Sequence, residues 1–135
     1  MNTILGIIEK KGGLKKLEAE GHFKIKVKGY MDLSIDFIGK GPNGLPMIAV
    51  SHNFIQNGDV MADPDMQVEV GQGLKGPELF PVTYQQSSLS IYQEVYTTDA
   101  EGKAVGVRTR LKMQLRSFLR TWGANLRRQG FLAAA

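Results

Sequence analysis

The chain has no cysteine and only two histidines among its 135 residues. The absence of cysteine excludes disulfides, thiolate metal sites and cysteine nucleophiles, and it is compatible with a reducing, intracellular compartment. The sequence also lacks the motifs of a P-loop, a dinucleotide-binding glycine loop, an EF-hand and an H-E-x-x-H zinc site. We therefore expect no resident cofactor and no resident metal, and we favour a binding protein over an enzyme.

Long apolar runs are missing as well. The most continuous one, Leu45 to Val50, is far shorter than the roughly 18 residues that a membrane-spanning helix needs. Acidic and glycine residues stand near the N-terminus, where a secretory signal would have an apolar core. These features predict a cytoplasmic protein without a membrane segment. The length suits one domain with its own core, so we expect residues 1–135 to form a single domain.

Charge is distributed unevenly along the chain. Residues 53–101 contain one Lys or Arg against eight Asp and Glu, whereas residues 102–135 contain eight Lys and Arg and no acidic residue. A basic segment can contact nucleic acid. It can equally attract the acidic segment of the same fold or of a second copy. A homodimer is therefore compatible with this pattern.

The spacing of apolar residues changes along the chain from helical to alternating and back. Residues 2–20 predict a helix that is capped by Asn2 or Thr3 and broken at Gly12-Gly13. Residues 107–130 predict a longer helix, whose apolar stripe contains Leu111, Leu115, Phe118, Trp122 and Leu126.

Between the helices, apolar residues alternate with polar ones, as in half-buried strands. Residues 22–37 predict a hairpin with a loop at Gly29 to Met31, which would place Lys24 opposite Asp36. Further strands are expected at residues 46–50, 66–70, 79–85 and 89–97. The fold class predicted is α+β, a mostly antiparallel sheet of about five to six strands with an N-terminal helix and a long C-terminal helix packed on it.

The stretch SHNFIQNGDVMADPDM (residues 51–66) concentrates polar and acidic residues. We interpret it as a loop of two turns, Asn57-Gly58 and Asp63-Pro64, because both dipeptides favour turns. We also expect its acidic side chains to face the basic helix. The recognition surface predicted from this loop and from the strand at 89–97 contains Gln56, Asn57, Asp59, Asp63, Asp65, Gln93 and Glu94.

The same carboxylates keep a second hypothesis open. Asp59, Asp63, Asp65 and Glu94, together with His52, are oxygen and nitrogen donors of the kind that bind divalent ions. A metal-dependent hydrolase that uses the acidic loop 59–65 is therefore the alternative. Its weakness is that the spacing matches no metal-binding motif.

The predicted C-terminal helix has a basic stripe beside its apolar one. Lys112, Arg116, Arg120 and Arg127 make up this stripe. Such a row can bind nucleic-acid phosphates, or it can be a solvated face that docks onto acidic neighbours.

Three segments together resemble a known family: HNFIQNGDVMADPDMQVEV (52–70), PVTYQQSSLSIYQEVY (81–96) and FLRTWGANLRRQGF (118–131). They resemble small bacterial proteins that share a domain of unknown function and that occur in plasmids, phages and conjugative elements. The resemblance covers roughly residues 22–132. It implies an accessory role in a mobile element and transfers no catalytic residue.

Our leading hypothesis from the sequence is thus a non-enzymatic binding or accessory domain. It would use the predicted recognition surface, with the basic helix available to nucleic acid. A third hypothesis, a protein antagonist or assembly partner of host factors, follows from the resemblance to proteins of mobile elements.

Overall fold

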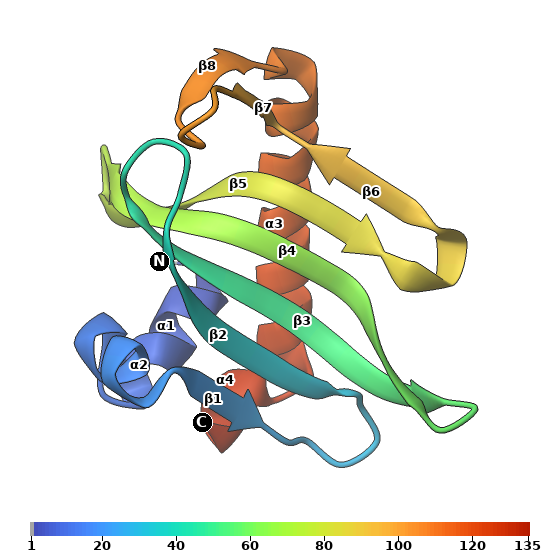
Figure 1. Ribbon diagram of the computed structural model, residues 1–135. Helices are drawn as coiled ribbons and strands as arrows, with labels where there is room; N and C mark the ends of the chain where they lie inside the picture. Colours follow the sequence, from blue (N-terminus) through green and yellow to red (C-terminus); the bar gives the residue numbers. More distant parts are fainter. Residues whose placement is uncertain (1) are drawn as a thin grey trace.

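The computed structural model describes residues 2–135, apart from the side chains of Gln56, Val60 and Ala62. Figure 1 shows a sheet with helices behind it and at one side. In chain order the elements are α1 (Thr3–Lys10), α2 (Leu14–Glu20), β1 (His22–Ile25), β2 (Asp32–Lys40), β3 (Pro46–Gln56), β4 (Asp59–Gly73), β5 (Gly76–Gln86), the 3₁₀ turn η1 (Ser87–Leu89), β6 (Ile91–Glu94), β7 (Tyr96–Thr98), β8 (Ala104–Val107), α3 (Thr109–Arg128) and α4 (Phe131–Ala134).

The main sheet has six strands in the order β1-β2-β3-β4-β5-β6, and every neighbouring pair is antiparallel. Each strand therefore pairs with the next one along the chain. Strands β7 and β8 form a separate two-stranded sheet. With helices at both ends of the chain, this arrangement is the α+β fold that the sequence predicts.

The helices form where their capping residues and apolar stripes predict them. The side chain of Asn2 caps α1, since its Oδ1 accepts a hydrogen bond from the backbone N–H of Ile4 at 2.8 Å. Helix α3 crosses behind the sheet (Figure 1) and buries Leu115, Trp122 and Leu126. It also buries Leu119, which the predicted stripe omits, because the sheet covers a wider arc of the helix than that stripe.

The core lies between this helical layer and one face of the sheet. Its buried side chains come from α1, α2, the strands β1 to β5, α3 and α4, with Val95 and Tyr96 at the junction with the smaller sheet. None of the helices in the described part of the chain is long and apolar enough to cross a membrane.

The first hairpin forms in a different register from the one predicted. His22 pairs with Asp36, and Lys24 pairs with Ser34. The connection is longer than a three-residue loop, because a turn in which the N–H of Tyr30 bonds the carbonyl of Val27 replaces the end of the strand. A shift of two residues leaves every side chain on its predicted face, so the apolar pattern alone does not distinguish the two registers.

Residues 51–66 are not a loop, and this prediction is wrong. Strands β3 and β4 run through the stretch as one long hairpin, and only Asn57-Gly58 is a turn, with both residues at positive φ. Asp63 and Pro64, joined by a cis peptide bond, lie inside β4 at an irregularity where three β4 steps match two β3 steps. Such an insertion is a β-bulge, and it changes the face to which the following side chains point.

The strand predicted at residues 89–97 is divided into three parts. Residues 87–89 form η1, and the extended segment breaks at Val95, between β6 and β7. Val95 is fully buried, and its N–H bonds the carbonyl of Val82 at 2.9 Å. The bend at Val95 turns the chain out of the main sheet and places the β7–β8 hairpin beside one of its corners (Figure 1).

Candidate functional site

The helices leave the opposite face of the main sheet open, and this face is polar. Its side chains alternate with the core residues along each strand. Strand pairing aligns them in two rows across the sheet, one with Asp36, Ala49, Gln67, Thr83 and Glu94, and the next with Ser34, Ser51, Asp65, Gln85 and Tyr92. Among these residues only Ala49 lacks a polar side-chain group.

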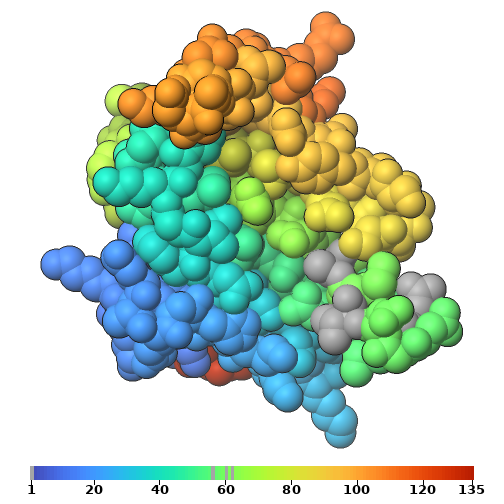
Figure 2. Space-filling model, viewed as in Figure 1, coloured from blue at the N-terminus to red at the C-terminus, as the bar shows by residue number. Residues whose placement is uncertain are grey.

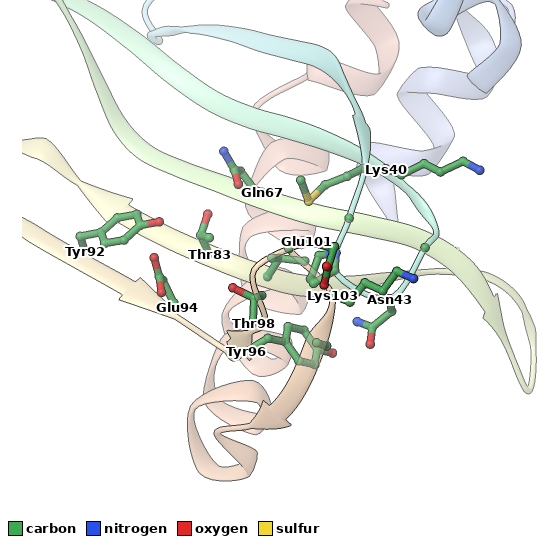
Figure 3. A pocket seen from close by; sticks show the side chains of 17 residues that line it. Lys40, Asn43, Gln67, Thr83, Tyr92, Glu94, Tyr96, Thr98, Glu101 and Lys103 are labelled. Atoms are coloured by element: carbon green, nitrogen blue, oxygen red, sulfur yellow. The ribbon is translucent and has the colours of Figure 1, made fainter.

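A pocket of about 900 Å³ lies at one end of this face. Figure 2 shows it as a hollow between the β7–β8 hairpin, the β2–β3 turn and β6. Gln67, Thr83 and Glu94 from the first row contribute to its floor, and Tyr92 from the second row stands at its edge (Figure 3). Its volume is within the range of small-molecule sites.

Two structural elements outside the main sheet form the rim. The β2–β3 turn, residues 41–45, is on one side, and the β7–β8 hairpin with Thr98, Glu101 and Lys103 is on the other (Figure 3). The two are joined, because the N–H of Ala104 donates a hydrogen bond to the carbonyl of Pro42 at 2.9 Å.

A buried carboxylate holds the β2–β3 turn in place. Glu69 is fully buried. It accepts hydrogen bonds from the backbone N–H of Asn43 at 3.1 Å, from the Asn43 side-chain amide at 2.6 Å and from the N–H of Leu45 at 3.2 Å. Gly41 passes so close that a Cβ there would lie 2.5 Å from the Glu69 Cγ. This wall of the pocket is therefore fixed by a side chain from the sheet.

The charges around the pocket are balanced. Its lining contains two lysines, Lys40 and Lys103, and two glutamates, Glu94 and Glu101. The rest of the polar lining consists of hydroxyl and amide groups, which can donate and accept hydrogen bonds. Tyr92 is 57% exposed and offers one ring for stacking. This combination suits a polar ligand without a large net charge.

Of the groups proposed for a hydrolase, only Glu94 lines the pocket. No histidine lines it. In the described part of the chain, no three His, Asp or Glu side chains lie close enough together to hold a metal ion. Of the groups proposed for a hydrolase, His52 points into the helical layer, where its ring centroid is 5.6 Å from that of Trp122, whereas Asp65 and Glu94 lie on the open face. The groups proposed for a hydrolase are thus divided between the two faces of the sheet.

The carboxylate of Asp65, on the open face, is partly buried. Partial burial raises the pKa of Asp65, and the negative charge of Asp36 raises it further. Asp36 itself bonds the Nδ1 of His22 at the edge of the sheet. A raised folded-state pKa means that the folded protein loses stability as pH rises from about 4, the pKa of an unfolded aspartate, through the raised value.

Replacing this carboxylate should therefore stabilise the protein at neutral pH. We expect Asp65→Asn to raise the Tm at pH 7 by a few degrees and to lose this advantage as the pH falls below about 4, where Asp65 becomes protonated in both states. Thermal unfolding between pH 3.5 and 8 measures the effect. Asp59→Asn, at the exposed tip of the β3–β4 hairpin, removes the same charge and is the matched control. A lower Tm for Asp65→Asn at pH 7 would contradict the prediction.

The predicted recognition residues do not form one surface. Asn57 and Asp59 are exposed at the tip of the β3–β4 hairpin, and the side chain of Gln56 lies outside the described residues. Gln93 pairs with Tyr84 on the helix side of β6, opposite to Glu94. The remaining two are divided by the β4 bulge. Asp63 lies on the helix side, where Ser88 donates a hydrogen bond to it, and Asp65 lies on the open face.

The predicted basic stripe is partly engaged within the fold. Arg116 forms an ion pair with Glu78 of β5, and the Nζ of Lys112 lies 5.6 Å from the ring centroid of Tyr96. Arg120 and Arg127 are exposed and form no ion pair with the side chains that the structure describes. The contact expected between this stripe and the acidic side chains of residues 51–66 is not observed among the described side chains. The acidic partner of Arg116 is Glu78, which belongs to β5.

Sequence reasoning included Glu94 but missed most of the pocket. The sequence does not single out Gln67, Thr83 or the turn at residues 41–45, because each looks like an ordinary strand or turn residue. The signal that could have found the floor is the run of polar residues at alternating positions of three neighbouring strands, where a sheet covered on both faces would have apolar residues.

Comparison with known families gives one result that covers almost the whole chain. Residues 2–132 match the family described as Domain of unknown function (DUF6908). Neither the curated proteins nor the solved structures contain a match to the sequence or the fold. The chain belongs to the family of this domain of unknown function.

Proposed function

We propose that the protein is a non-enzymatic binding domain whose pocket on the open sheet face holds a sugar ring, either free or as part of a nucleoside. The observation that supports this most is the row of Gln67, Thr83 and Glu94 beside the exposed ring of Tyr92. Hydroxyl groups of a sugar can donate to the Glu94 carboxylate and exchange hydrogen bonds with the amide and the threonine hydroxyl.

The charge balance supports the same ligand class. With Lys40 and Lys103 offset by Glu94 and Glu101, the pocket has no excess of one sign to attract a polyanion or a polycation. An apolar ring face would stack on the exposed ring of Tyr92. An accessory role in a mobile element, which the sequence resemblance implies, is compatible with such a module.

Calorimetric titration with a panel of monosaccharides, disaccharides and nucleosides tests the proposal. We expect Tyr92→Ala to weaken binding about tenfold, the equivalent of roughly 1.4 kcal/mol of stacking and burial. The matched control is Tyr30→Ala, because Tyr30 is 50% exposed but lies away from this pocket. If no member of the panel binds, or if Tyr92→Ala binds as well as the unchanged protein, the proposal is wrong.

A second candidate function rests on Arg120 and Arg127. Both are exposed on the outer side of α3, and residues 102–135 contain no carboxylate side chain that could neutralise them. Phosphate contacts through two arginines would give a binding constant that depends on salt with a slope of about −2 for duplex DNA and somewhat less for single strands. We expect the double variant Arg120→Ala, Arg127→Ala to abolish this slope.

Fluorescence anisotropy with short duplex and single-stranded DNA at salt concentrations from about 50 to 200 mM measures this slope. Arg116→Ala is the control, since Arg116 already pairs with Glu78. An absence of binding at about 50 mM salt, where phosphate contacts are strongest, would remove nucleic acid from consideration.

A further inference from the structure

A second cavity, of about 240 Å³, lies on the other side of the sheet from the proposed sugar site. It is a half-open hollow between the C-terminal half of α3, the bulge of β4 and the β1–β2 connection. Figure 1 shows α3 behind the sheet, on the side away from the viewer. It is smaller than a typical drug-sized site, so it suits a head group better than a whole metabolite.

Four of the ten residues that line this cavity have aromatic rings. Tyr30, His52, Phe118 and Trp122 all line it. The rings of His52 and Phe118 flank Trp122, with centroid distances of 5.6 and 5.8 Å and interplanar angles of 55° and 43°. Rings that pack in this way form one aromatic surface, and the π faces that line the hollow can attract a positive charge.

The only formally charged side chain among the described residues that line the cavity is a carboxylate. This is Asp63, which the β4 bulge turns toward α3, and its Oδ2 accepts the hydroxyl of Ser88. Neither a lysine nor an arginine lines the cavity. Burial lowers the pKa of His52, so its ring is neutral at pH 7 and adds no opposing charge. The lining thus combines one negative charge with four aromatic rings.

Residues that are far apart in the sequence supply this lining. Asp63 and Pro64 lie in the segment 52–70, and Trp122, Asn125 and Gln129 lie in the segment 118–131; both segments resemble the family of small bacterial proteins. The pocket on the open face accounts for none of these five residues.

We propose that this cavity binds an alkylammonium group, such as the trimethylammonium of choline or of a methylated lysine. The methyl groups would pack against the rings of Tyr30, Phe118 and Trp122, and the positive charge would be offset by Asp63. A positive charge without N–H groups suits the aromatic part of the lining, because aromatic rings attract a cation but are poor hydrogen-bond acceptors. The inference is independent of the sugar site, which lies on the opposite face.

The cavity contains its own reporter, because Trp122 is the one tryptophan of the chain. Its fluorescence would be followed while choline chloride is added, with sodium chloride at the same ionic strength as a blank. We expect a saturable change with choline. The neutral isostere 3,3-dimethylbutan-1-ol, which has the same shape without the charge, should bind at least about tenfold more weakly.

Two variants and their controls locate the effect. Asp63→Asn and Tyr30→Ala should each weaken choline binding about five- to tenfold. Asp65→Asn and Tyr92→Ala change the same residue types on the open face and should leave it unchanged. Circular dichroism confirms that each variant is folded. Both Asp63→Asn and Tyr30→Ala change side chains that are not fully buried, so at least one of them is expected to fold.

The results separate the outcomes. A short peptide with trimethyl-lysine that binds more tightly than choline would identify a modified protein as the source of the group, and the reverse order would identify a free small cation. Both orders support the proposal. No saturable response to choline, equal binding of the neutral isostere, or unchanged binding by both Asp63→Asn and Tyr30→Ala would overturn it.

Discussion

Replacing Glu69 with alanine should lower the free energy of unfolding by about 3 kcal/mol and the Tm by about 10 °C. Glu69 is fully buried and accepts three hydrogen bonds, two from Asn43 and one from Leu45. A buried donor that loses its partner costs about 1–3 kcal/mol. We expect less than the sum of three such losses, because the β2–β3 turn can move outward until water reaches the freed amides.

That movement has a functional consequence. The turn forms one wall of the pocket on the open face and bonds the β7–β8 hairpin through Pro42 and Ala104. Any ligand of this pocket should therefore bind more weakly to Glu69→Ala than to the unchanged protein, even though Glu69 does not line the pocket. Calorimetry on the folded variant, at a temperature well below its Tm, separates this effect from unfolding.

Urea denaturation measures the loss of stability, with Glu78→Ala as the control. Glu78 is a partly exposed glutamate whose ion pair with Arg116 should contribute no more than about 1 kcal/mol. Glu69→Gln should fall between the two, because the amide retains one acceptor oxygen but directs an N–H group toward the donors of the turn. Equal stability of Glu69→Ala and Glu78→Ala would show that the turn does not depend on the buried carboxylate.

The sequence predicts the fold well because the information that sets it is local and periodic. The caps, the apolar stripe of α3 and the alternation of Phe23, Ile25, Leu33 and Ile35 each specify an element and its inward face. A register shift of two residues in the first hairpin keeps all of these faces. For this reason the order of layers was predictable, whereas the residues of β2 that pair with His22 and Lys24 were not.

The sites were less predictable because they depend on irregularities and on long-range contacts. In a regular strand Asp63 and Asp65 would point to the same face. The bulge at Asp63 and Pro64 instead sends them to opposite sides, one to the aromatic cavity and one to the open face. Likewise, nothing in the local sequence of Glu69 shows that it will bond a turn 24 to 26 residues earlier in the chain.

Removing the aromatic ring of Phe131 should cost about 3–5 kcal/mol of unfolding free energy, more than the Glu69 substitution. Phe131 is fully buried in the short helix α4, which follows Gly130 in its left-handed conformation. Its ring centroid lies 5.5 Å from that of His52 and 6.3 Å from that of Tyr30. Phe131→Ala therefore leaves a cavity behind two residues that line the proposed alkylammonium site.

Two measurements test this role for Phe131. Urea denaturation gives the stability, and Phe131→Leu, which retains most of the apolar volume, should lose only about 1 kcal/mol. NMR titration gives the pKa of His52, which burial holds below its ordinary value. In Phe131→Ala the imidazole gains access to water, so its pKa should rise toward 6.5. If the loss of stability is below about 1 kcal/mol and the pKa of His52 does not change, then α4 is not an integral part of the core and does not support the aromatic cavity.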